Sequence, residues 1–272
     1  MGLYDGSATM RLLRRILITT AIALGMIAFG VYWVAPVVLS FQAARKAPPV
    51  ARVVPADLRD LSVSQTPGTK LSYVGYEFEI PWNDLDESQT RQSPKDNPNM
   101  VALKFRSGRS LLVTTSPPRA LLDNFARQYK LSPTDLESLV GRHHASESDY
   151  DFLRALYGFT PDKMHYWTVS PALHYREQFL LLLKSIVLFK SAENGIFSIQ
   201  SGPYRGFQQG DPNRPGRILV QLFSDSGNIE FFLGGKDMQS PTGLTQPEVN
   251  RIVQSFHRIQ QGQSTAPPVA QR

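Results

Sequence analysis

The stretch ILVQLFSDSGNIEFFL, residues Ile218–Leu233, decides the fold class of this chain. It holds two apolar, β-prone runs, Ile218–Phe223 and Ile229–Leu233, on either side of the turn-forming residues Ser224–Asn228. Two such runs around a short polar turn are typical of a β-hairpin. The stretch therefore predicts two neighbouring antiparallel strands in a sheet.

A long helix is predicted upstream of this hairpin, over residues Pro171–Ala192. Ser170 precedes the proline as an N-cap residue, an arrangement that favours the start of a helix. Apolar side chains then recur every three or four residues, as they do along one helix face: Tyr175, Phe179, Leu182, Ile186 and Phe189. We interpret this helix as the central core helix, with the alternative that it lies against the membrane or a partner helix.

Strands and helices continue outward on both sides of these two elements. Residues Val74–Ile80 alternate apolar and polar residues and predict a strand, and Val101–Thr115 predicts another hairpin. Downstream, Thr245–Glu248 has the pattern of a capping box, which starts a last helix. Strands before and after a helical block predict an α+β domain, an antiparallel sheet with flanking helices.

One apolar run near the N-terminus predicts a transmembrane helix before this domain. Residues Ile16–Leu39 hold no charged residue and exceed the roughly 20 residues that span a hydrocarbon core as a helix. The run is longer than the apolar region of a cleavable signal peptide, which predicts an uncleaved anchor. Basic residues flank both ends almost equally, and the short N-terminal tail favours a C-terminal part outside the cytoplasm.

The chain then divides into five parts. We expect a cytoplasmic tail at residues 1–15, a transmembrane anchor at 16–41, a proline-containing tether at 42–70, one α+β extracytoplasmic domain at 71–260 and a disordered tail at 261–272. The sequence therefore predicts a single-pass protein of the cell membrane.

Charge and cysteine content argue against several classes of function. The net charge of +6 is concentrated near the anchor, because residues 1–50 carry five basic residues and one acidic residue, whereas residues 51–272 carry 24 basic and 22 acidic residues. A nearly neutral domain without a basic, aromatic-rich stripe argues against a nucleic-acid partner. The absence of cysteine excludes disulfides, thiolate metal sites and cysteine nucleophiles.

Two segments of the domain resemble the PsbP-like family of extrinsic and periplasmic domains. Residues Gly75–Trp82, with the sequence GYEFEIPW, are similar to that family's opening strand, and Glu248–Arg258 are similar to its closing helix. The hairpin at Ile218–Leu233 is similar to its late hairpin. The resemblance implies a shared fold and a binding or accessory role without a catalytic set of residues.

The segment Gly202–Arg217 is the first candidate for a binding site. Its glycines allow a backbone to approach a ligand closely, and its arginines can bind carboxylate or phosphate through two parallel hydrogen bonds. The spacing matches neither a P-loop nor a dinucleotide fingerprint, and the alternative is a strand connection shaped by glycine and proline. The candidate ligand or partner residues are Arg205, Gln208, Gln209, Arg214 and Arg217.

A second candidate site is a cluster of metal-ligating residue types, His143, His144 and Glu147. His143 and Glu147 are four residues apart, so a continuous helix would place them on one face. The cluster has no HExxH pattern, and Gly141 and Ser146 indicate a helix break. The alternative is a solvated junction between two helices.

The sequence shows no paired acid and base and no cofactor motif. We therefore expect a non-catalytic binding or accessory domain without a cofactor, anchored in the lipid bilayer by residues 16–41, with an envelope protein as its partner. The alternative is an envelope hydrolase that uses carboxylates or a metal. Ala21 and Gly25 form a small-xxx-small pair, which favours a homodimer through the anchor.

Overall fold

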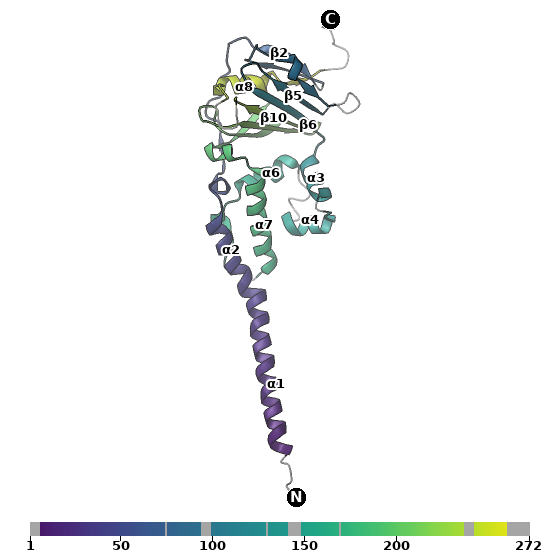
Figure 1. Ribbon diagram of the computed structural model, residues 1–272, viewed down its shortest axis with the longest axis vertical. Helices are drawn as coiled ribbons and strands as arrows, with labels where there is room; N and C mark the ends of the chain where they lie inside the picture. The colour runs from purple at the N-terminus through teal and green to yellow at the C-terminus, as the bar shows by residue number, and fades with distance from the viewer. Residues whose placement is uncertain are drawn as a thin grey trace.

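The computed structural model describes residues 6–73, 75–93, 99–128, 130–140, 148–168, 170–236 and 242–259. One long N-terminal helix leads up to a layered α+β domain built around a large sheet (Figure 1). A small sheet and the last helix cover the face of the large sheet that points away from the long helix, here called the distal face. The other helices cover the opposite, proximal face.

The predicted hairpin forms the centre of the large sheet. Strands β9 (Ile218–Ser224) and β10 (Gly227–Gly234) pair antiparallel, with Gln221 opposite Glu230. The strand order is β1-β7-β8-β9-β10-β6-β5-β4, in which β1 and β7 are parallel and the other neighbours are antiparallel. The remaining bounds are Pro55–Asp57 (β1), Arg91–Gln92 (β4), Met100–Lys104 (β5), Ser110–Ser116 (β6), Ile196–Ser201 (β7) and Tyr204–Gln209 (β8).

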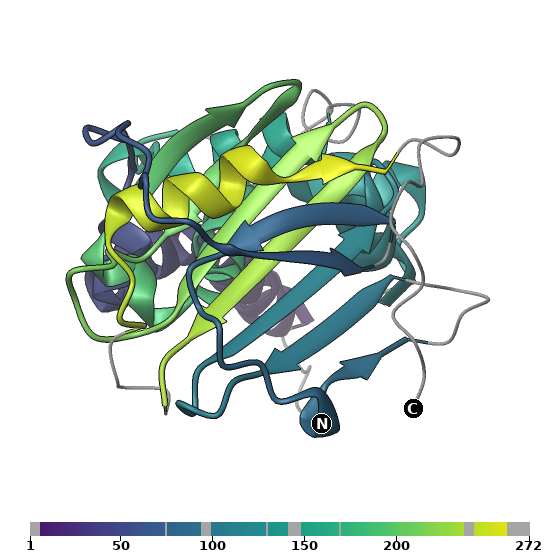
Figure 2. The same cartoon turned by 90° about the horizontal axis from the view of Figure 1, so that it is seen from above.

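A second, smaller sheet and helix α8 (Gln246–Ser255) form the distal layer. The small sheet has the order β11-β3-β2, with bounds His257–Arg258, Tyr76–Ile80 and Thr69–Tyr73. Figure 2 shows α8 and the β2–β3 hairpin lying across the large sheet. The apolar core of this half lies between the two layers, and its fully buried members include Phe78, Ile80, Val220, Phe231 and Ile252.

Among the described residues, four helices form the proximal layer. Their bounds are Ala120–Gln128 (α3), Pro133–Val140 (α4), Asp149–Gly158 (α6) and Pro171–Val187 (α7), and short 3-10 turns cover Pro49–Arg52, Glu87–Gln89, Pro161–Lys163 and Lys190–Asn194. A second apolar core lies under the sheet, where Leu153 and Tyr157 of α6 belong to one buried cluster with Phe207 and Ile196. The prediction of an α+β domain with an antiparallel-dominated sheet and flanking helices is confirmed.

The N-terminal helix is longer than the predicted anchor. It runs without a break through α1 (Gly6–Phe29), a π-helical turn (Gly30–Val34) and α2 (Ala35–Lys46). The π-turn ends two residues before Pro36, whose missing N–H interrupts the regular hydrogen-bond pattern. Within it, Arg15–Lys46 is long and apolar enough to cross a membrane, as the sequence predicts.

The segment predicted as a tether, residues 42–70, packs on the domain over much of its length. The helix continues to Lys46, the side chains of Val50 and Ala51 are buried, and Pro55–Asp57 pairs with β7. Prolines disfavour helices but are compatible with a short edge strand, which is how Pro55 is used here. The predicted disordered tail, 261–272, lies outside the described residues.

Helix α7 differs from the predicted core helix in the face that it buries. Three members of the predicted apolar face, Tyr175, Leu182 and Ile186, are exposed, Leu182 by 58% and Ile186 by 68%. The buried positions include three polar residues instead: His174, Glu177 and Lys184. The helix therefore buries polar groups beside apolar ones such as Leu181, and part of its apolar surface faces outward.

Candidate functional site

The five residues predicted to bind a ligand do not lie together. Arg205, Gln208 and Gln209 belong to strand β8, whereas Arg214 and Arg217 lie in the connection to β9. Because side chains alternate along a strand, Gln208 faces α8 in the distal layer, whereas Arg205 and Gln209 face α6 in the proximal layer. Of the five, Arg205 and Gln208 line one pocket, which we call the edge pocket.

The edge pocket is a cavity of about 390 Å³ at the side of the large sheet where β1 ends. Strand β1 stops at Asp57, opposite Ser198, so no strand among the described residues pairs with the outer edge of β7 from Ile199 onward. A strand edge without a neighbour offers backbone N–H and C=O groups to an added strand. Beside this edge, the side chains of Leu58, Leu61 and Val253 supply apolar surface.

Arg205 is the principal cationic group of the edge pocket. Its guanidinium carbon lies 4.6 Å from the centroid of the Tyr150 ring, and that ring stacks on Phe207 at 5.3 Å. Among the described residues, no carboxylate forms an ion pair with it. A guanidinium placed over an aromatic ring keeps N–H donors that can bind a carboxylate.

A network of buried amides forms the distal side of the edge pocket. Gln208 and Gln246 exchange reciprocal hydrogen bonds of 2.8 and 3.0 Å, and Gln246 donates a further bond to Asn250. Asn250 in turn donates to the backbone carbonyls of Asp60 and Ser62. Gln208 therefore positions the pocket by fixing the segment that carries Leu61, because its own amide donors are bonded within the protein.

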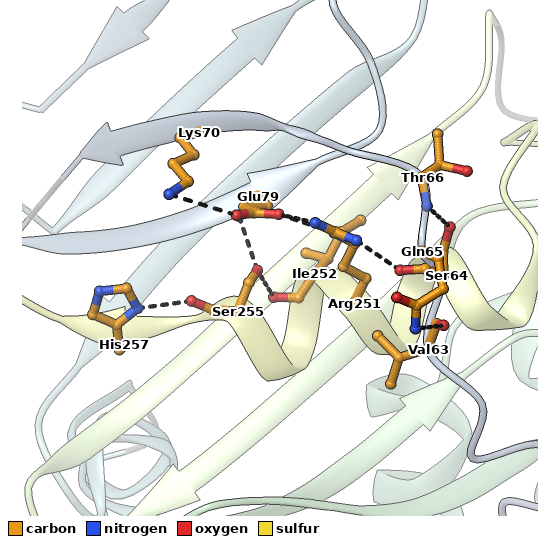
Figure 3. Close-up of polar contacts among 10 residues, drawn as sticks. All are labelled: Val63, Ser64, Gln65, Thr66, Lys70, Glu79, Arg251, Ile252, Ser255 and His257. Carbon is orange, nitrogen blue, oxygen red and sulfur yellow. Dashed lines mark hydrogen bonds and ion pairs between the residues drawn. The ribbon is translucent and has the colours of Figure 1, made fainter.

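An ion pair on α8 fixes the next part of the same segment. Arg251 donates two hydrogen bonds to one carboxylate oxygen of Glu79 on β3, at 2.9 and 2.6 Å, and a third to the carbonyl of Ser64 at 2.7 Å. Figure 3 shows the guanidinium between Glu79 and Ser64, with Lys70 on the other side of the carboxylate. Two residues of α8, Asn250 and Arg251, thus hold the chain that borders the edge pocket.

Gln209 belongs to a different, buried chain of hydrogen bonds. Its amide donates to the hydroxyl of Tyr157, which donates to Gln221, which donates to a carboxylate oxygen of Glu230. Burial, together with the nearby Glu230 carboxylate, raises the pKa of Tyr157 above its ordinary value. This tyrosine therefore stays neutral and acts as a fixed link between α6 and the sheet.

Glu230 and Asp149 line a second cavity, of about 310 Å³, between the sheet and helices α3 and α6. Asp149 is 1% exposed and accepts hydrogen bonds from the backbone N–H groups of Leu121 and Leu122 and from the side chain of Asn228. Burial raises the pKa of this carboxyl group, while the three donors oppose that rise. Asp149 accepts hydrogen bonds from two N–H groups in the first turn of α3 and so fixes the start of that helix, which indicates a structural role.

The other two predicted binding residues lie at the far end of the β8–β9 connection. Arg214 is exposed, with its Nε 3.9 Å from a carboxylate oxygen of Asp211. Arg217 lines a third cavity, of about 800 Å³, together with Phe189 and Ser191. The Ser191 hydroxyl is buried and has no hydrogen-bond partner within the described part of the chain. Neither arginine contributes to the edge pocket.

The predicted metal-binding residues, His143, His144 and Glu147, lie outside the described residues. Where the structure does describe the chain, no three histidine, aspartate or glutamate residues gather in a way that could hold a metal ion. Ala21 and Gly25, the pair predicted to form a dimer contact, are exposed on α1.

Comparison of the chain with protein-family models finds no match, and comparison with curated proteins finds none either. The resemblance to PsbP-like domains therefore stays a prediction.

Sequence reasoning missed the residues that complete the edge pocket. Tyr150, Leu61 and Asn250 come from three segments far apart along the chain, and no local pattern links them to Arg205. The alternation of side chains along strand β8 is a signal that was available, because Arg205 and Gln208 are three positions apart, an odd spacing that places them on opposite faces. It does not identify the ring on which Arg205 stacks.

Proposed function

We propose that this protein is a single-pass, membrane-anchored domain that binds an extended segment of an envelope protein in its edge pocket. The segment is expected to carry a carboxylate, which pairs with Arg205, next to an apolar side chain, which contacts Leu58 and Leu61. The uncovered edge of β7 adds backbone hydrogen bonds to the same segment. The role is that of a binding domain and not of an enzyme.

The observation that carries this proposal is the position of Arg205 over the Tyr150 ring without an ion-pair partner among the described residues. A charged group near an open strand edge, oriented by the Tyr150 ring and without a carboxylate partner among the described residues, is suited to recognise an anionic ligand. The apolar residues beside it suit a peptide better than a small inorganic anion.

The alternative is a hydrolase that uses two carboxylates, and its active site would be the cavity lined by Asp149 and Glu230. Both groups are engaged in hydrogen bonds with protein donors, Asp149 with three and Glu230 with Gln221 and Thr114. A catalytic acid or base needs to reach a substrate proton. The hydrogen-bond pattern therefore supports the binding role over this alternative.

The anchor and its orientation are part of the same proposal. Helix residues 16–41 hold the protein in the lipid bilayer, with the domain outside the cytoplasm and with the pair Ala21 and Gly25 available for a second copy of the helix. Protease added to intact spheroplasts is expected to cleave the domain. Cleavage that occurs only after the cells are lysed would contradict the orientation.

A peptide library tests the edge pocket directly. The full-length protein, solubilised in detergent, is used to select peptides from a random display library. We expect the selected peptides to share an aspartate or glutamate beside an apolar residue. The variant Arg205→Ala is expected to lose at least about tenfold in affinity for them, which corresponds to about 1.4 kcal/mol for a charged hydrogen-bonded contact.

The variant Arg214→Ala is the matched control, because it removes an exposed arginine from the same part of the sequence but outside the edge pocket. Its affinity for the selected peptides should equal that of the wild type. Equal losses in the two variants, or a selection without acidic residues, would show that binding depends on general charge or on another surface, and the proposal would fail.

A further inference from the structure

Helix α7 packs against α2, the last part of the N-terminal helix, through polar groups. The Ser40 hydroxyl lies 3.0 Å from Nδ1 of His174, and Gln178 donates hydrogen bonds to the same hydroxyl and to the carbonyl of Pro36. Ser40 and His174 are almost completely buried. These contacts place the first half of α7 at the level of Ser40 along the N-terminal helix. Figure 1 shows α2 and α7 side by side.

The level of Ser40 relative to the bilayer follows from helix geometry. Ser40 is 24 residues beyond Ile16, where the charge-free run begins, which is about 36 Å at 1.5 Å per residue. The hydrocarbon core is about 30 Å thick, and the bilayer with its headgroups about 40–45 Å. If the core begins at Ile16, Ser40 and its neighbours lie within the far headgroup layer.

Aromatic side chains gather at this level. The ring of Phe41, next to Ser40, stacks on Tyr166 at 4.3 Å and meets the edge of Trp167 at 5.8 Å. Trp167 is 84% exposed, and Tyr175, one position after His174, is 51% exposed. Exposure of this extent is unusual for tryptophan in water, whereas tryptophan and tyrosine are enriched where a bilayer meets water.

We propose that Phe41, Tyr166, Trp167 and Tyr175 form an aromatic belt that inserts into the headgroup layer and seats the domain directly on the membrane surface. The belt rests on the proposed membrane anchoring and adds a second contact with the lipid, made by the domain itself. Its continuity with the anchor, through Phe41 on the same helix, favours lipid over a second protein as the occupant.

The belt has a defined extent along α7. Leu181 packs with Ala44 and Ala51, beyond Ser40, and the ammonium group of Lys184 binds the carbonyl of Val53. The helix thus leads away from the bilayer, and Ile186 lies past the headgroup level. Direct seating also explains why the expected tether is packed on the domain, because a domain held at the surface does not need a flexible spacer.

Tryptophan fluorescence in vesicles tests the belt, because the three tryptophans occupy three environments. Trp33 lies in the anchor, Trp82 is buried in the distal core, and Trp167 is in the belt. Full-length protein is reconstituted into phosphatidylcholine vesicles, with or without phosphatidylcholine brominated near the headgroup end of an acyl chain. The variants W33F, W167F and W33F/W167F replace exposed residues only, so all three should keep the fold.

The variant W33F retains Trp167 and the buried Trp82, and it is expected to lose fluorescence in brominated vesicles. The double variant retains Trp82 alone and should show no loss. W167F retains Trp33 and should be quenched, which reports independently that the anchor is inserted. Acrylamide, equilibrated across the vesicles by freezing and thawing, should quench W33F less in vesicles than in detergent-free unfolded protein.

Two results would overturn the belt and leave the anchor standing. Quenching of W167F but not of W33F by brominated lipid, with full access of acrylamide to Trp167, would place Trp167 in water. If brominated lipid quenches W167F but not W33F, and Trp167 is also protected from acrylamide, a second copy or another protein covers Trp167. If neither W33F nor W167F is quenched by brominated lipid, the membrane anchoring fails together with the belt.

Discussion

The large sheet and the pair of helices α2 and α7, which we call the stalk, differ in how many polar groups they bury. In the sheet, apolar side chains such as Phe231 and Val220 are buried between two layers. In the stalk, the groups buried between elements include His174, Glu177 and Lys184, while Leu182 and Ile186 are exposed. The difference teaches that the sheet is organised by the exclusion of water, whereas the stalk is organised by specific hydrogen bonds.

Each buried polar group of the stalk has its partners. Glu177 accepts hydrogen bonds from the backbone N–H and from Nδ1 of His165, at 2.9 and 2.5 Å. His174 contacts Ser40 with one ring nitrogen and the carbonyl of Thr168 with the other. Because the Thr168 carbonyl can only accept, the ring donates there, and in a neutral ring Nδ1 is then the acceptor of the Ser40 hydroxyl proton. These hydrogen bonds fix how α7 packs against α2 and against the segment around His165.

The largest effect is expected from the substitution Phe231→Ala in the sheet. Phe231 is fully buried and contacts the rings of Phe78 and Phe256, at centroid distances of 6.1 and 5.2 Å. Its truncation leaves a cavity and should lower the free energy of unfolding by about 3–5 kcal/mol. Denaturant titration of the detergent-solubilised protein, followed by the fluorescence of the buried Trp82, measures the change.

The matched control is Leu182→Ala on the exposed side of the stalk. In detergent this substitution removes a side chain that is 58% exposed, so the free energy of unfolding should change by no more than about 0.5 kcal/mol. A loss at Leu182 as large as the loss at Phe231 would mean that the two regions bury the same kind of surface, and the comparison would be broken.

The sequence predicts the sheet well because its signals are local. The hairpin at Ile218–Leu233, the alternation before Pro81 and the capping box at Thr245 each contain their own turn or cap, and all three are found in the structure. Strand β1 escaped prediction because it is three residues long and contains Pro55, and its pairing with β7 brings together segments far apart in the chain.

The stalk and the edge pocket are harder to predict for a different physical reason. The period of three and four residues in α7 identifies an apolar face correctly, but periodicity does not say whether that face meets the core or the surroundings. For the edge pocket, Arg205 and Gln208 were identifiable as residue types, whereas the Tyr150 ring that orients Arg205 is known only once α6 is placed on the sheet.

An intermediate effect is expected from Lys184→Met, the substitution that tests the polar interior of the stalk. The ammonium group is fully buried and donates hydrogen bonds to the carbonyls of Val53, Tyr157 and Phe159, at 2.7, 2.8 and 2.7 Å. Methionine fills a similar volume but leaves these acceptors unpaired. We expect a loss of about 1–3 kcal/mol in the free energy of unfolding, measured by the same titration at neutral pH.

The pH dependence of this difference sharpens the test. Burial, with Lys163 as a second cause, lowers the pKa of Lys184 from 10.5 to about 8. Between these two values the unfolded chain binds a proton that the folded chain does not, so the stability of the wild type rises with pH in this window. The free energy of unfolding of the wild type should therefore rise relative to that of Lys184→Met from about pH 8 upward. A constant difference would show that the three carbonyls fully offset the cost of burial.

The smallest effects are expected at the surface of the distal layer, where Lys70 and Arg251 share the carboxylate of Glu79. Lys70 is exposed and 4.0 Å from that carboxylate, so Lys70→Ala should leave the stability unchanged within error. Arg251 is largely covered and also holds the carbonyl of Ser64, so Arg251→Ala should cost about 1 kcal/mol.

The two variants also differ in what they do to the edge pocket. Because Arg251 fixes the segment that borders the pocket, its loss should weaken binding of the peptides selected on the wild type, and loss of Lys70 should not. Equal affinities in both variants would show that Asn250 alone holds that segment through the carbonyls of Asp60 and Ser62. The ion pair at Glu79 would then stabilise the distal layer without a role in recognition.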